Sequence, residues 1–244
     1  MSDRSPLFAA HHLQKSFRKI PVINDLSLAI YSSEIVAILG ANGAGKTTLF
    51  DLCMGILKPN CGKLFFQGKE ITSLPLHRRG QLGIGYLAQN PSIFRQMSVA
   101  ENILALLELQ SLSRMQQKTR LEELLDLFEL TELATEKAIT LSGGEKRRLE
   151  IARSLVTRPQ LFFLDEPFAN VDPLTIEQLK QHLLQLKKQG ISIFLTDHNA
   201  KEVLSFVDHC YLLHKGTLIA SGTREQLIQN SVAKQLYLGE QFSL

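Results

Sequence analysis

Short apolar runs that end in glycine or in polar residues recur along the chain and predict buried strands. They read EIVAILG at 34–40, GIGYLAQ at 83–89, LFFLDE at 161–166 and ISIFLTDH at 191–198. Runs of about four to eight apolar residues, bounded in this way, are typical of strands that are covered on both faces of a sheet. We therefore expect these runs to form strands of a buried sheet.

Helical signals lie between these runs. Residues 46–57 predict a helix that stops at Lys58-Pro59-Asn60, because proline lacks the amide hydrogen that a helix interior needs. Residues 91–158 contain helical segments and few strand signals, so they predict a helical insertion in an α/β core. One more helix is predicted where helical spacing is followed by a capping glycine, in Ile176, Leu179, Leu183, Leu186 and Gly190.

Two further segments have the pattern of paired strands. Residues 63–71 predict a strand pair that turns at Gly68. Residues 210–222 predict a hairpin that turns at Lys215-Gly216. The whole pattern predicts an α/β fold interrupted by a helical segment.

The composition is that of an ordinary globular chain. Its 244 residues predict one large or two small domains, and 44% hydrophobic residues provide ample material for a core. A net charge of +3 is too small and too scattered to indicate a nucleic-acid partner. Cys53, Cys61 and Cys210 lack paired spacing, so we expect reduced cytosolic thiols and neither a disulfide nor a zinc site.

Membrane-spanning and targeting patterns are also missing from the sequence. The N-terminal residues lack the continuous apolar stretch of a signal peptide. No window approaches the roughly 18 to 20 apolar residues that cross a bilayer. If the protein works at a membrane, we expect another chain to supply the spanning helices.

A glycine-rich loop follows the first apolar run and precedes the first predicted helix. It matches the pattern G-x-x-x-x-G-K-[ST], which binds phosphate in this strand–loop–helix context. Glycines let the backbone amides face the phosphates, Lys46 reaches the β and γ phosphates, and the Thr47 hydroxyl can coordinate Mg²⁺. The matching residues are Gly40, Ala41, Asn42, Gly43, Ala44, Gly45, Lys46 and Thr47.

Polar residues end the other apolar runs, at the sheet edge where ligands bind in open α/β folds. We expect Asp165 to hold Mg²⁺ and Glu166 to act as the general base or to position the attacking water. We expect Gln89 to bridge the metal and this water, and His198 to contact the γ-phosphate and to orient Glu166. The alternatives are a solvated strand end for the carboxylates and a structural role for His198, and the neighbouring phosphate loop favours the nucleotide site.

A second helix start suited to anions lies at LSGGEKRR. Ser142 and Glu145 fit a capping box, which predicts that a helix begins at Gly143-Gly144. A serine hydroxyl and bare glycine amides at a helix N-terminus can hold an anion, although no lysine accompanies them. The segment is explained if Ser142, Gly143 and Gly144 bind the γ-phosphate held by Lys46 of a second copy. The alternative is an ordinary capped helix.

The order of these segments resembles the ATP-binding cassette (ABC) ATPases across nearly the whole chain. GANGAGKTT, Gln89, LSGGE, LFFLDEP and TDH match that family's Walker A, Q-loop, signature, Walker B and switch histidine. The resemblance implies a P-loop NTPase (RecA-like) core with an antiparallel β subdomain and an inserted α-helical subdomain. It also implies an ATPase that dimerises on ATP, opens on hydrolysis, and docks coupling helices of membrane partners on its helical subdomain.

The resemblance also implies how the chain is divided and what its residues do. It implies a single ABC ATPase domain, with the core, β subdomain and tail in 1–90 and 159–244 and the helical subdomain in 91–158. It implies that Phe17 stacks on adenine where tyrosine is common, and that Asp172 is the D-loop aspartate. The implied catalytic residues are Lys46, Gln89, Glu166 and His198; the implied Mg²⁺ ligands are Thr47, Gln89 and Asp165; the implied ATP contacts are Phe17, Gly40, Ala41, Asn42, Gly43, Ala44, Gly45, Lys46, Thr47 and Thr48, with Ser142, Gly143 and Gly144 in trans.

Several stretches resemble one branch of the family, the ATPases that power bacterial lipopolysaccharide export. They are PLHRRGQLGIGYLAQNPSIFRQMSV, LSGGEKRRLEIAR, LDEPFANVDP, TDHN and the ending YLGEQFSL. By this resemblance Phe94 and Arg95 receive the coupling helices of integral membrane subunits similar to LptF and LptG, at the cytoplasmic face of the inner membrane. Ala41 replaces a proline that is common in this branch, and the family's usual S-A-L-D reads Ala169-Asn170-Val171-Asp172. An exposed aromatic and a solvated cation are the alternative for Phe94 and Arg95.

Other functions share much of this sequence pattern. An ATPase of another ABC system, such as an amino-acid importer, carries the same nucleotide motifs. A soluble ATPase of iron–sulfur assembly also remains open, whereas a chromosome-maintenance type needs long coiled-coil heptads that are absent here. A non-enzymatic binding module would need a damaged site, yet Lys46, Asp165, Glu166 and His198 are all present.

Overall fold

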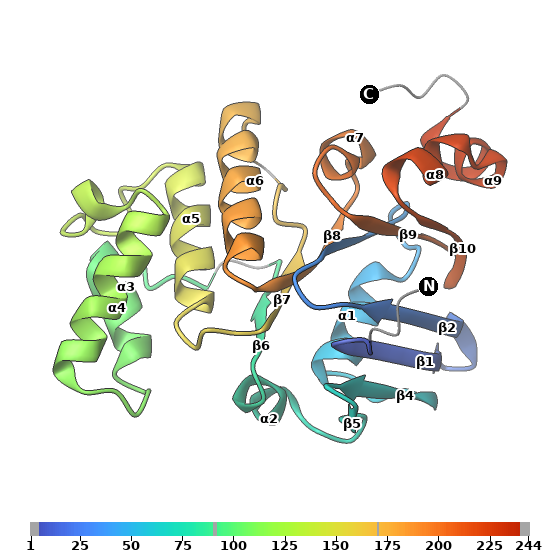
Figure 1. Cartoon of the computed structure of the whole chain (residues 1–244), viewed down its shortest axis with the longest axis horizontal. Helices are drawn as coiled ribbons and strands as arrows, with labels where there is room; N and C mark the ends of the chain where they lie inside the picture. The colour runs from blue at the N-terminus through green and yellow to red at the C-terminus, as the bar shows by residue number, and fades with distance from the viewer. Residues whose placement is uncertain (1–4, 90–91, 170, 240–244) are drawn as a thin grey trace.

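The predicted apolar runs form a six-stranded, mostly parallel sheet. The computed structural model describes residues 5–89, 92–169 and 171–239. The strands of this sheet are β3 (Ile35–Leu39), β6 (Ile84–Leu87), β7 (Leu161–Asp165), β8 (Ser192–Asp197), β9 (His209–His214) and β10 (Thr217–Gly222). Their order is β10-β9-β3-β8-β7-β6, and every neighbouring pair is parallel except β9–β10, the hairpin predicted at Lys215-Gly216 (Figure 1). The predicted α/β fold is therefore confirmed.

The parallel strands bring their carboxyl ends to one edge of the sheet. The register pairs Leu39 of β3 with Asp197 of β8, and Asp165 of β7 with Thr196 of β8. The loop that follows β3 and the polar residues that end β7 and β8 therefore begin side by side. This edge is where ligands bind in open α/β sheets.

A four-stranded antiparallel sheet packs beside the first. It has the order β2-β1-β4-β5 and consists of β1 (Phe8–Phe17), β2 (Ile20–Ile30), β4 (Cys61–Phe66) and β5 (Lys69–Glu70). The strand pair predicted at 63–71 is β4–β5, with its turn at Gly68. The turn between β1 and β2 has positive φ at both Arg18 and Lys19 (47° and 71°), so glycine-based turn signals do not reveal it.

The first helix ends earlier than its apolar pattern predicts. Helix α1 covers Lys46–Met54, and Gly55 follows with φ of 74°. Glycine adopts this left-handed conformation easily, so the helix ends there although the apolar run continues to Leu57. The predicted helix over 46–57 is therefore wrong at its C-terminal end, because Gly55 stops it before Lys58-Pro59 does.

The chain between β6 and β7 forms the predicted helices. They are α3 (Val99–Leu107), α4 (Arg114–Leu127) and α5 (Gly143–Ser154), with a 3₁₀ turn at Thr131–Leu133. They lie together at one end of the molecule (Figure 1, left). Each α-helix begins with a capping box, in which a serine side chain accepts an N–H three residues on and a Glu or Gln side chain returns the bond.

The other helices are α2 (Leu76–Gln81), α6 (Pro173–Lys188), α7 (Ala200–Leu204), α8 (Arg224–Gln229) and α9 (Ser231–Ala233), followed by a π-helical turn at Lys234–Leu238. Helix α6 is the one predicted from helical spacing, and Gly190 lies just beyond its end with φ of 90°. None of the helices within the described ranges combines the length and hydropathy that crossing a bilayer requires.

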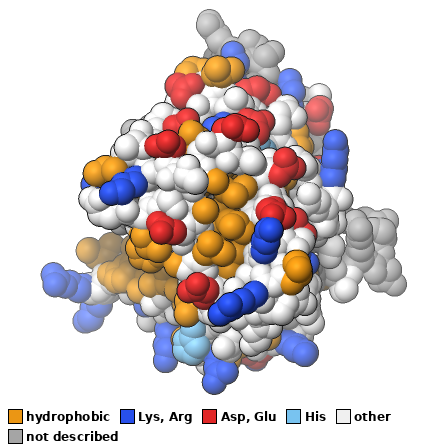
Figure 2. All heavy atoms as spheres, turned by 90° about the vertical axis from the view of Figure 1, so that its left-hand side faces the viewer, with side chains coloured by type: hydrophobic (Ala, Val, Ile, Leu, Met, Phe, Trp, Pro, Cys, Tyr) orange, Lys and Arg blue, Asp and Glu red, His pale blue; other side chains and the backbone are white. Residues whose placement is uncertain are grey.

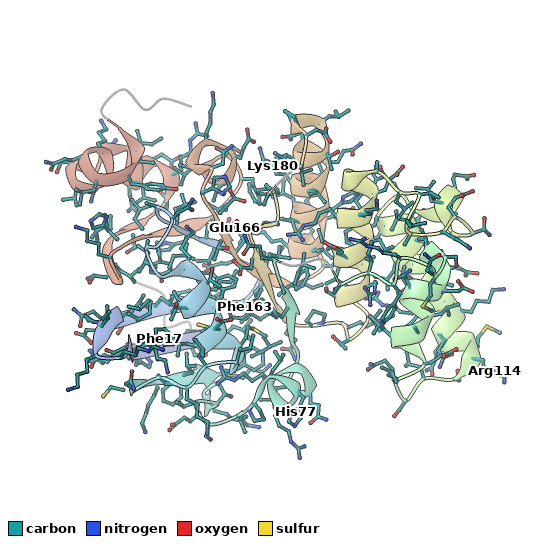
Figure 3. The ribbon with its side chains drawn as sticks, turned by 180° about the vertical axis from the view of Figure 1, so that it is seen from behind. Phe17, His77, Arg114, Phe163, Glu166 and Lys180 are labelled. Carbon is teal, nitrogen blue, oxygen red and sulfur yellow. The ribbon has the colours of Figure 1, made fainter. Side chains whose placement is uncertain are left out.

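The core consists of two hydrophobic clusters on opposite faces of the main sheet. Along β7, Phe162 and Leu164 join the cluster under α3–α6, while Leu161 and Phe163 join the cluster under α1 and the antiparallel sheet. Alternate residues of a strand point to opposite faces, so a run that is apolar throughout is buried on both sides. Phe163 (Figure 3) packs against Phe50 of α1 with ring centroids 5.3 Å apart.

A fully buried arginine joins α1 to α2. The guanidinium of Arg79 donates to the carbonyl of Leu74 (2.8 Å), to Thr72 (3.1 Å), to Leu52 (2.9 Å) and to Cys53. The last two carbonyls belong to the C-terminal turn of α1, where a helix dipole favours a positive charge. Burial lowers the pKa of Arg79.

We expect Arg79→Met to lower the free energy of unfolding by about 3 kcal/mol, because it leaves several buried carbonyls without a donor. Chemical denaturation monitored by circular dichroism measures this change. The matched control is Arg78→Met on the same helix, where the side chain is exposed and the expected loss is below about 0.5 kcal/mol. Equal stability of the two variants would contradict a stabilising role of the buried Arg79 hydrogen bonds.

Candidate active site

The glycine-rich loop lies between β3 and α1, as predicted. Gly45, the residue before α1, has φ of 108°, and a Cβ at this position would lie 3.0 Å from both the Val22 carbonyl oxygen and the Ile23 side chain. The amide of Ala44 donates to the carbonyl of Ala41 at 3.0 Å, which closes the loop on itself. Glycine is required here for its conformation and for the close approach of β2.

Lys46 lies buried at the centre of this loop. Its Nζ donates to the carbonyl oxygens of Gly40 (2.7 Å) and Ala41 (3.2 Å). Burial lowers the pKa of Lys46, while the carboxylates of Glu166, Asp165 and Asp197 act in the opposite direction. The ammonium is therefore held between the loop and the carboxylates of β7 and β8, where a phosphate can replace the carbonyl partners.

The two carboxylates at the end of β7 have different surroundings. Asp165 is almost fully buried, which raises its pKa, and its Oδ1 accepts the Thr196 hydroxyl at 2.6 Å. Glu166 (Figure 3) is partly exposed, and its Oε2 accepts Gln89 Nε2 at 2.9 Å. The structure thus joins Gln89 and Glu166, two residues that the sequence predicts for one site.

The backbone of Glu166 adopts an unusual conformation. Its φ is 46°, in the left-handed region, which costs a residue with a side chain about 1–2 kcal/mol. Its N–H donates to Thr196 Oγ1 at 2.9 Å, and its carbonyl accepts Arg147 Nη2 at 3.0 Å. Strain of this kind persists where surrounding contacts enforce it and is concentrated at functional sites.

Arg147 connects the signature helix to the end of β7. It lies on α5 and is buried, with Nε donating to the Pro167 carbonyl at 3.0 Å and Nη1 to Glu150 Oε2 at 2.9 Å. Together with its bond to Glu166, these contacts tie α5 to the segment that carries the carboxylates. The sequence pattern does not indicate these contacts of Arg147, because they depend on the packing of α5 against the end of β7.

His198 follows β8 at the same sheet edge. Its N–H and that of Asn199 donate to Asp197 Oδ1 at 2.7 and 2.9 Å, and its carbonyl accepts the Tyr237 hydroxyl at 3.0 Å. The imidazole side chain is 56% exposed. In the described part of the chain the ring makes no hydrogen bond to Glu166, so the expected orientation of Glu166 by His198 stays a prediction.

The signature segment has the predicted capping box. Ser142 N–H donates to Glu145 Oε2 at 2.7 Å, and Glu145 N–H donates to Ser142 Oγ at 3.3 Å. Ser142 and Gly143 are exposed. A Cβ at Gly144 would lie 2.6 Å from Thr175 Oγ1, so the close approach of α6 requires glycine at this position. The serine and the first glycine are therefore presented outward.

A cavity of about 630 Å³ separates the helical segment from the sheet edge. Gln89 and Glu166 line one side, and Gly143, Arg95 and Arg147 line others. None of residues 40–48 is among its lining residues. The signature of one molecule thus shares a cavity with its own Q-loop and Glu166 but not with its own phosphate loop.

Two further residues were predicted for the site, Phe17 and Asp172. Phe17 ends β1 with 43% of its surface exposed and has Lys15 Nζ 5.3 Å from its ring centroid, so one aromatic surface is accessible for stacking. Asp172 caps α6: its carboxylate accepts the N–H and the hydroxyl of Thr175 at 3.0 and 2.7 Å. These bonds lower the pKa of Asp172.

The loop that carries Phe94 and Arg95 is held by buried side chains. Asn102 accepts the Phe94 N–H at 2.8 Å and donates to the Phe94 and Ser98 carbonyls at 2.9 Å each. The Arg153 guanidinium lies 4.6 Å from the centroid of the Phe94 ring. Phe94 and Arg95 are both exposed on this ordered support.

The donor set fits a nucleotide-bound Mg²⁺. The described residues contain no group of three or more His, Cys, Asp or Glu side chains that could hold a metal by themselves. Mg²⁺ at nucleotide sites needs only one or two protein oxygens, because phosphates and water supply the others. The Asp165 carboxylate, the Thr47 hydroxyl and the Gln89 amide are hard oxygen donors of this type.

Two buried polar residues at the site were not predicted from the sequence, although the sequence contains a signal for them. Thr196 and Asp197 are polar residues in the last two positions of an apolar strand, and both are buried against the site. Their polarity could have indicated them. Three parts of the family resemblance lie outside the described residues: residues 240–244 of the tail, Asn90-Pro91 and Asn170.

Comparisons with known proteins agree with this geometry. The sequence model of the ABC transporter family matches residues 23–169. The chain is 42% identical over 240 residues, 98% of its length and all of the relative's, to the lipopolysaccharide export system ATP-binding protein LptB of Acidithiobacillus ferridurans. The LptB of Escherichia coli strain K12 is 42% identical over 236 residues, which cover 96% of this chain and 98% of that one.

Two further comparisons define the family more broadly. A protein of Azorhizobium caulinodans, described as a probable ABC transporter ATP-binding protein, is also 42% identical over 97% of this chain and 84% of its own. The crystal structure of the ADP conformation of MJ1267, an ATP-binding cassette of an ABC transporter, superposes with a TM-score of 0.87 at 27% identity, covering 96% of this chain and 99% of that one. The chain therefore belongs to the ABC transporter family, in which it is an ATP-binding subunit that hydrolyses ATP.

Proposed function

We propose that this chain powers the export of lipopolysaccharide, as a peripheral subunit on the cytoplasmic face of an inner membrane. The observation that carries the proposal is the 42% identity over nearly full length to proteins named for this export system. We propose integral membrane partners resembling LptF and LptG, which supply the spanning helices. The substrate is ATP, which binds together with Mg²⁺.

We propose the following roles at the nucleotide. The amides of residues 40–48 and the Lys46 ammonium bind the phosphates, with Phe17 stacking on the adenine ring. Glu166 accepts the proton of the attacking water. Gln89 helps to position this water and donates a hydrogen bond to the Glu166 carboxylate. His198 contacts the γ-phosphate. Asp165, Thr47 and Gln89 would hold Mg²⁺, which would supply positive charge beside the phosphate oxygens.

We propose that each site is completed by a second copy. The exposed Ser142 and Gly143 face solvent at the start of α5, and no residue of the protein's own phosphate loop lines the cavity next to them. A helix N-terminus of this kind favours an anion. Two copies related by a two-fold axis place the signature of each on the γ-phosphate held by Lys46 of the other, with Asp172 at the seam.

We propose the helical subdomain, residues 91–158, as the docking surface for the membrane partners. Figure 2 looks onto the side formed by this segment and shows hydrophobic side chains gathered on it. Its exposed large hydrophobic residues, in the described part, are Phe94, Leu109, Met115 and Ile139. Phe94 and Arg95 offer an aromatic ring and a cation on a loop that Asn102 holds in place.

Copurification tests the proposed function. The chain is expressed with an affinity tag in its own cells, the membranes are solubilised in detergent, and the bound integral proteins are identified. We expect exporter subunits resembling LptF and LptG. Recovery of importer subunits, or of soluble iron–sulfur scaffold proteins only, would contradict lipopolysaccharide export.

Variants of the docking loop test the proposed surface. We expect Arg95→Glu to reduce the recovered membrane partners at least about 10-fold, because it reverses a charge at the interface. ATP turnover of the isolated chain should stay within about 2-fold, since Arg95 has no partner in the nucleotide roles above. Lys188→Glu, a charge reversal at an exposed residue of α6 outside the helical subdomain, is the control and should retain partner recovery. Unchanged recovery with Arg95→Glu would remove this loop from the docking surface.

A further inference from the structure

The hydroxyl of Thr196 links the two carboxylate residues at the end of β7. It donates to Asp165 Oδ1 at 2.6 Å and accepts the backbone N–H of Glu166 at 2.9 Å. Thr196 is fully buried on β8, directly paired with Asp165 across the parallel ladder. A hydroxyl offers one donor and two acceptor positions, so both bonds form at the same time.

The bond to Glu166 acts on a strained residue. With φ of 46°, the chain turns sharply out of β7 at this point. The peptide groups around Glu166 are held from two sides, its N–H by Thr196 and its carbonyl by Arg147. Without such contacts a glutamate would relax toward an ordinary backbone conformation.

The carboxylate of Glu166 has little other support. Among the described residues its oxygens accept a side-chain hydrogen bond from Gln89 alone. Its direction is therefore set mainly by the backbone from which it projects. A change in φ at Glu166 would move the carboxylate relative to Asp165 and Lys46.

We infer that Thr196 is a positioning residue for ATP hydrolysis: it fixes the direction of the Glu166 carboxylate relative to Asp165. It acts through Glu166, with its hydroxyl anchored by the bond to Asp165, and contacts neither phosphate nor water in this role. The inference rests on the proposed function, because it presumes that Glu166 is the general base. Threonine is suited to the position because its methyl group packs in the core while its hydroxyl makes both bonds.

Thr196→Val and Thr196→Ser separate this role from core packing. Valine keeps the shape and removes both hydrogen bonds, whereas serine keeps the bonds. We expect Thr196→Val to lower kcat about 10- to 100-fold, as displacement of a catalytic group does, while KM and the Kd for ATP change less than about 3-fold. We expect Thr196→Ser to retain kcat within about 3-fold.

The control is Ser192→Ala at the other end of β8. Ser192 is also fully buried, and its hydroxyl accepts the Ser33 N–H at 2.9 Å. Ser192→Ala therefore also removes a hydrogen bond of a buried hydroxyl, as Thr196→Val does. We expect it to keep kcat even if its thermal midpoint falls as far as that of Thr196→Val. If Thr196→Val does not fold, Thr196→Cys is measured in its place. A thiol is a weak donor and a weak acceptor, so we expect this variant to lower kcat at least about 5-fold.

A second arm combines Thr196→Val with Glu166→Gln. If Thr196 acts through Glu166, the double variant turns over ATP no more slowly than Glu166→Gln within about 2-fold. A full additional loss in the double variant, a wild-type kcat for Thr196→Val, or a serine variant as slow as the valine one would each overturn the inference. Wild-type turnover of Glu166→Gln would instead overturn the proposed role of Glu166, so the two failures are distinguishable.

Discussion

Replacing Glu166 by glutamine is expected to lower ATP turnover at least about 100-fold while ATP still binds. The amide cannot accept the proton of the attacking water, and general-base contributions of this kind are about 10²- to 10⁴-fold. Size and the Gln89 hydrogen bond are retained, because a glutamine side-chain oxygen also accepts from Gln89 Nε2. Steady-state phosphate release and equilibrium nucleotide binding measure the two quantities separately.

The same variant should accumulate as an ATP-bound dimer. In the proposed dimer, ATP bound between a phosphate loop and the partner's signature would hold the seam closed, and without hydrolysis nothing would open it again. Size-exclusion chromatography with ATP should therefore show a dimer that the wild-type chain populates only transiently. Glu177→Gln on the exposed surface of α6 is the control, for which turnover within about 2-fold of wild type is expected. Near wild-type hydrolysis by Glu166→Gln would exclude Glu166 as the base.

The geometry explains why Glu166 and not Asp165 suits this role. Asp165 is buried, and one oxygen is already bonded to Thr196, which suits the ligand role proposed for it. Glu166 is partly exposed and projects from a strained turn beside Gln89. Adjacent residues in sequence thus face different environments, because the chain leaves the sheet between them.

Much of the fold could be predicted from the sequence, because burial on both faces of a sheet leaves continuous apolar runs. The runs at 34–40, 161–166 and 191–198 became β3, β7 and β8. The turn at Arg18-Lys19 was not predicted, and the end of α1 at Gly55 was predicted wrongly. Backbone conformation decides both features, and hydrophobic spacing does not report it.

The sequence also predicts which residues belong to the candidate site, but it does not predict the contacts between them. Motifs identify Lys46, Gln89 and Glu166 because their chemistry needs particular side chains at particular spacings. The roles of Thr196 and Arg147 depend on the register of β8 against β7 and on the packing of α5. Neither quantity can be obtained from one element alone, since each is a property of two elements packed together.

Two inactive variants, Lys46→Ala and Ser142→Arg, are expected to restore activity when they are mixed. Each alone should turn over ATP at less than about a hundredth of the wild-type rate, since each loses an electrostatic contact to the transferred phosphate at both sites. In a mixed dimer, the intact phosphate loop of one protomer meets the intact signature of the other. At equal concentrations about half of the dimers are mixed and one site of two is intact, so about a quarter of wild-type turnover should return.

The mixture separates a composite site from a site within one chain. If the signature served its own phosphate loop, every protomer in the mixture would carry one defect and no activity would return. Isolated Ser142→Arg should also bind ATP with nearly wild-type affinity, because Lys46 and its loop are unchanged and Ser142 is exposed far along the chain at the start of α5. Adding Glu166→Gln to both partners gives a readout that is independent of turnover: a dimer forms with ATP in the mixture and in neither variant alone. Absence of that dimer, together with absent turnover, would show that the phosphate is not held between two copies, because one complete pair of loop and signature is all that the mixed dimer needs.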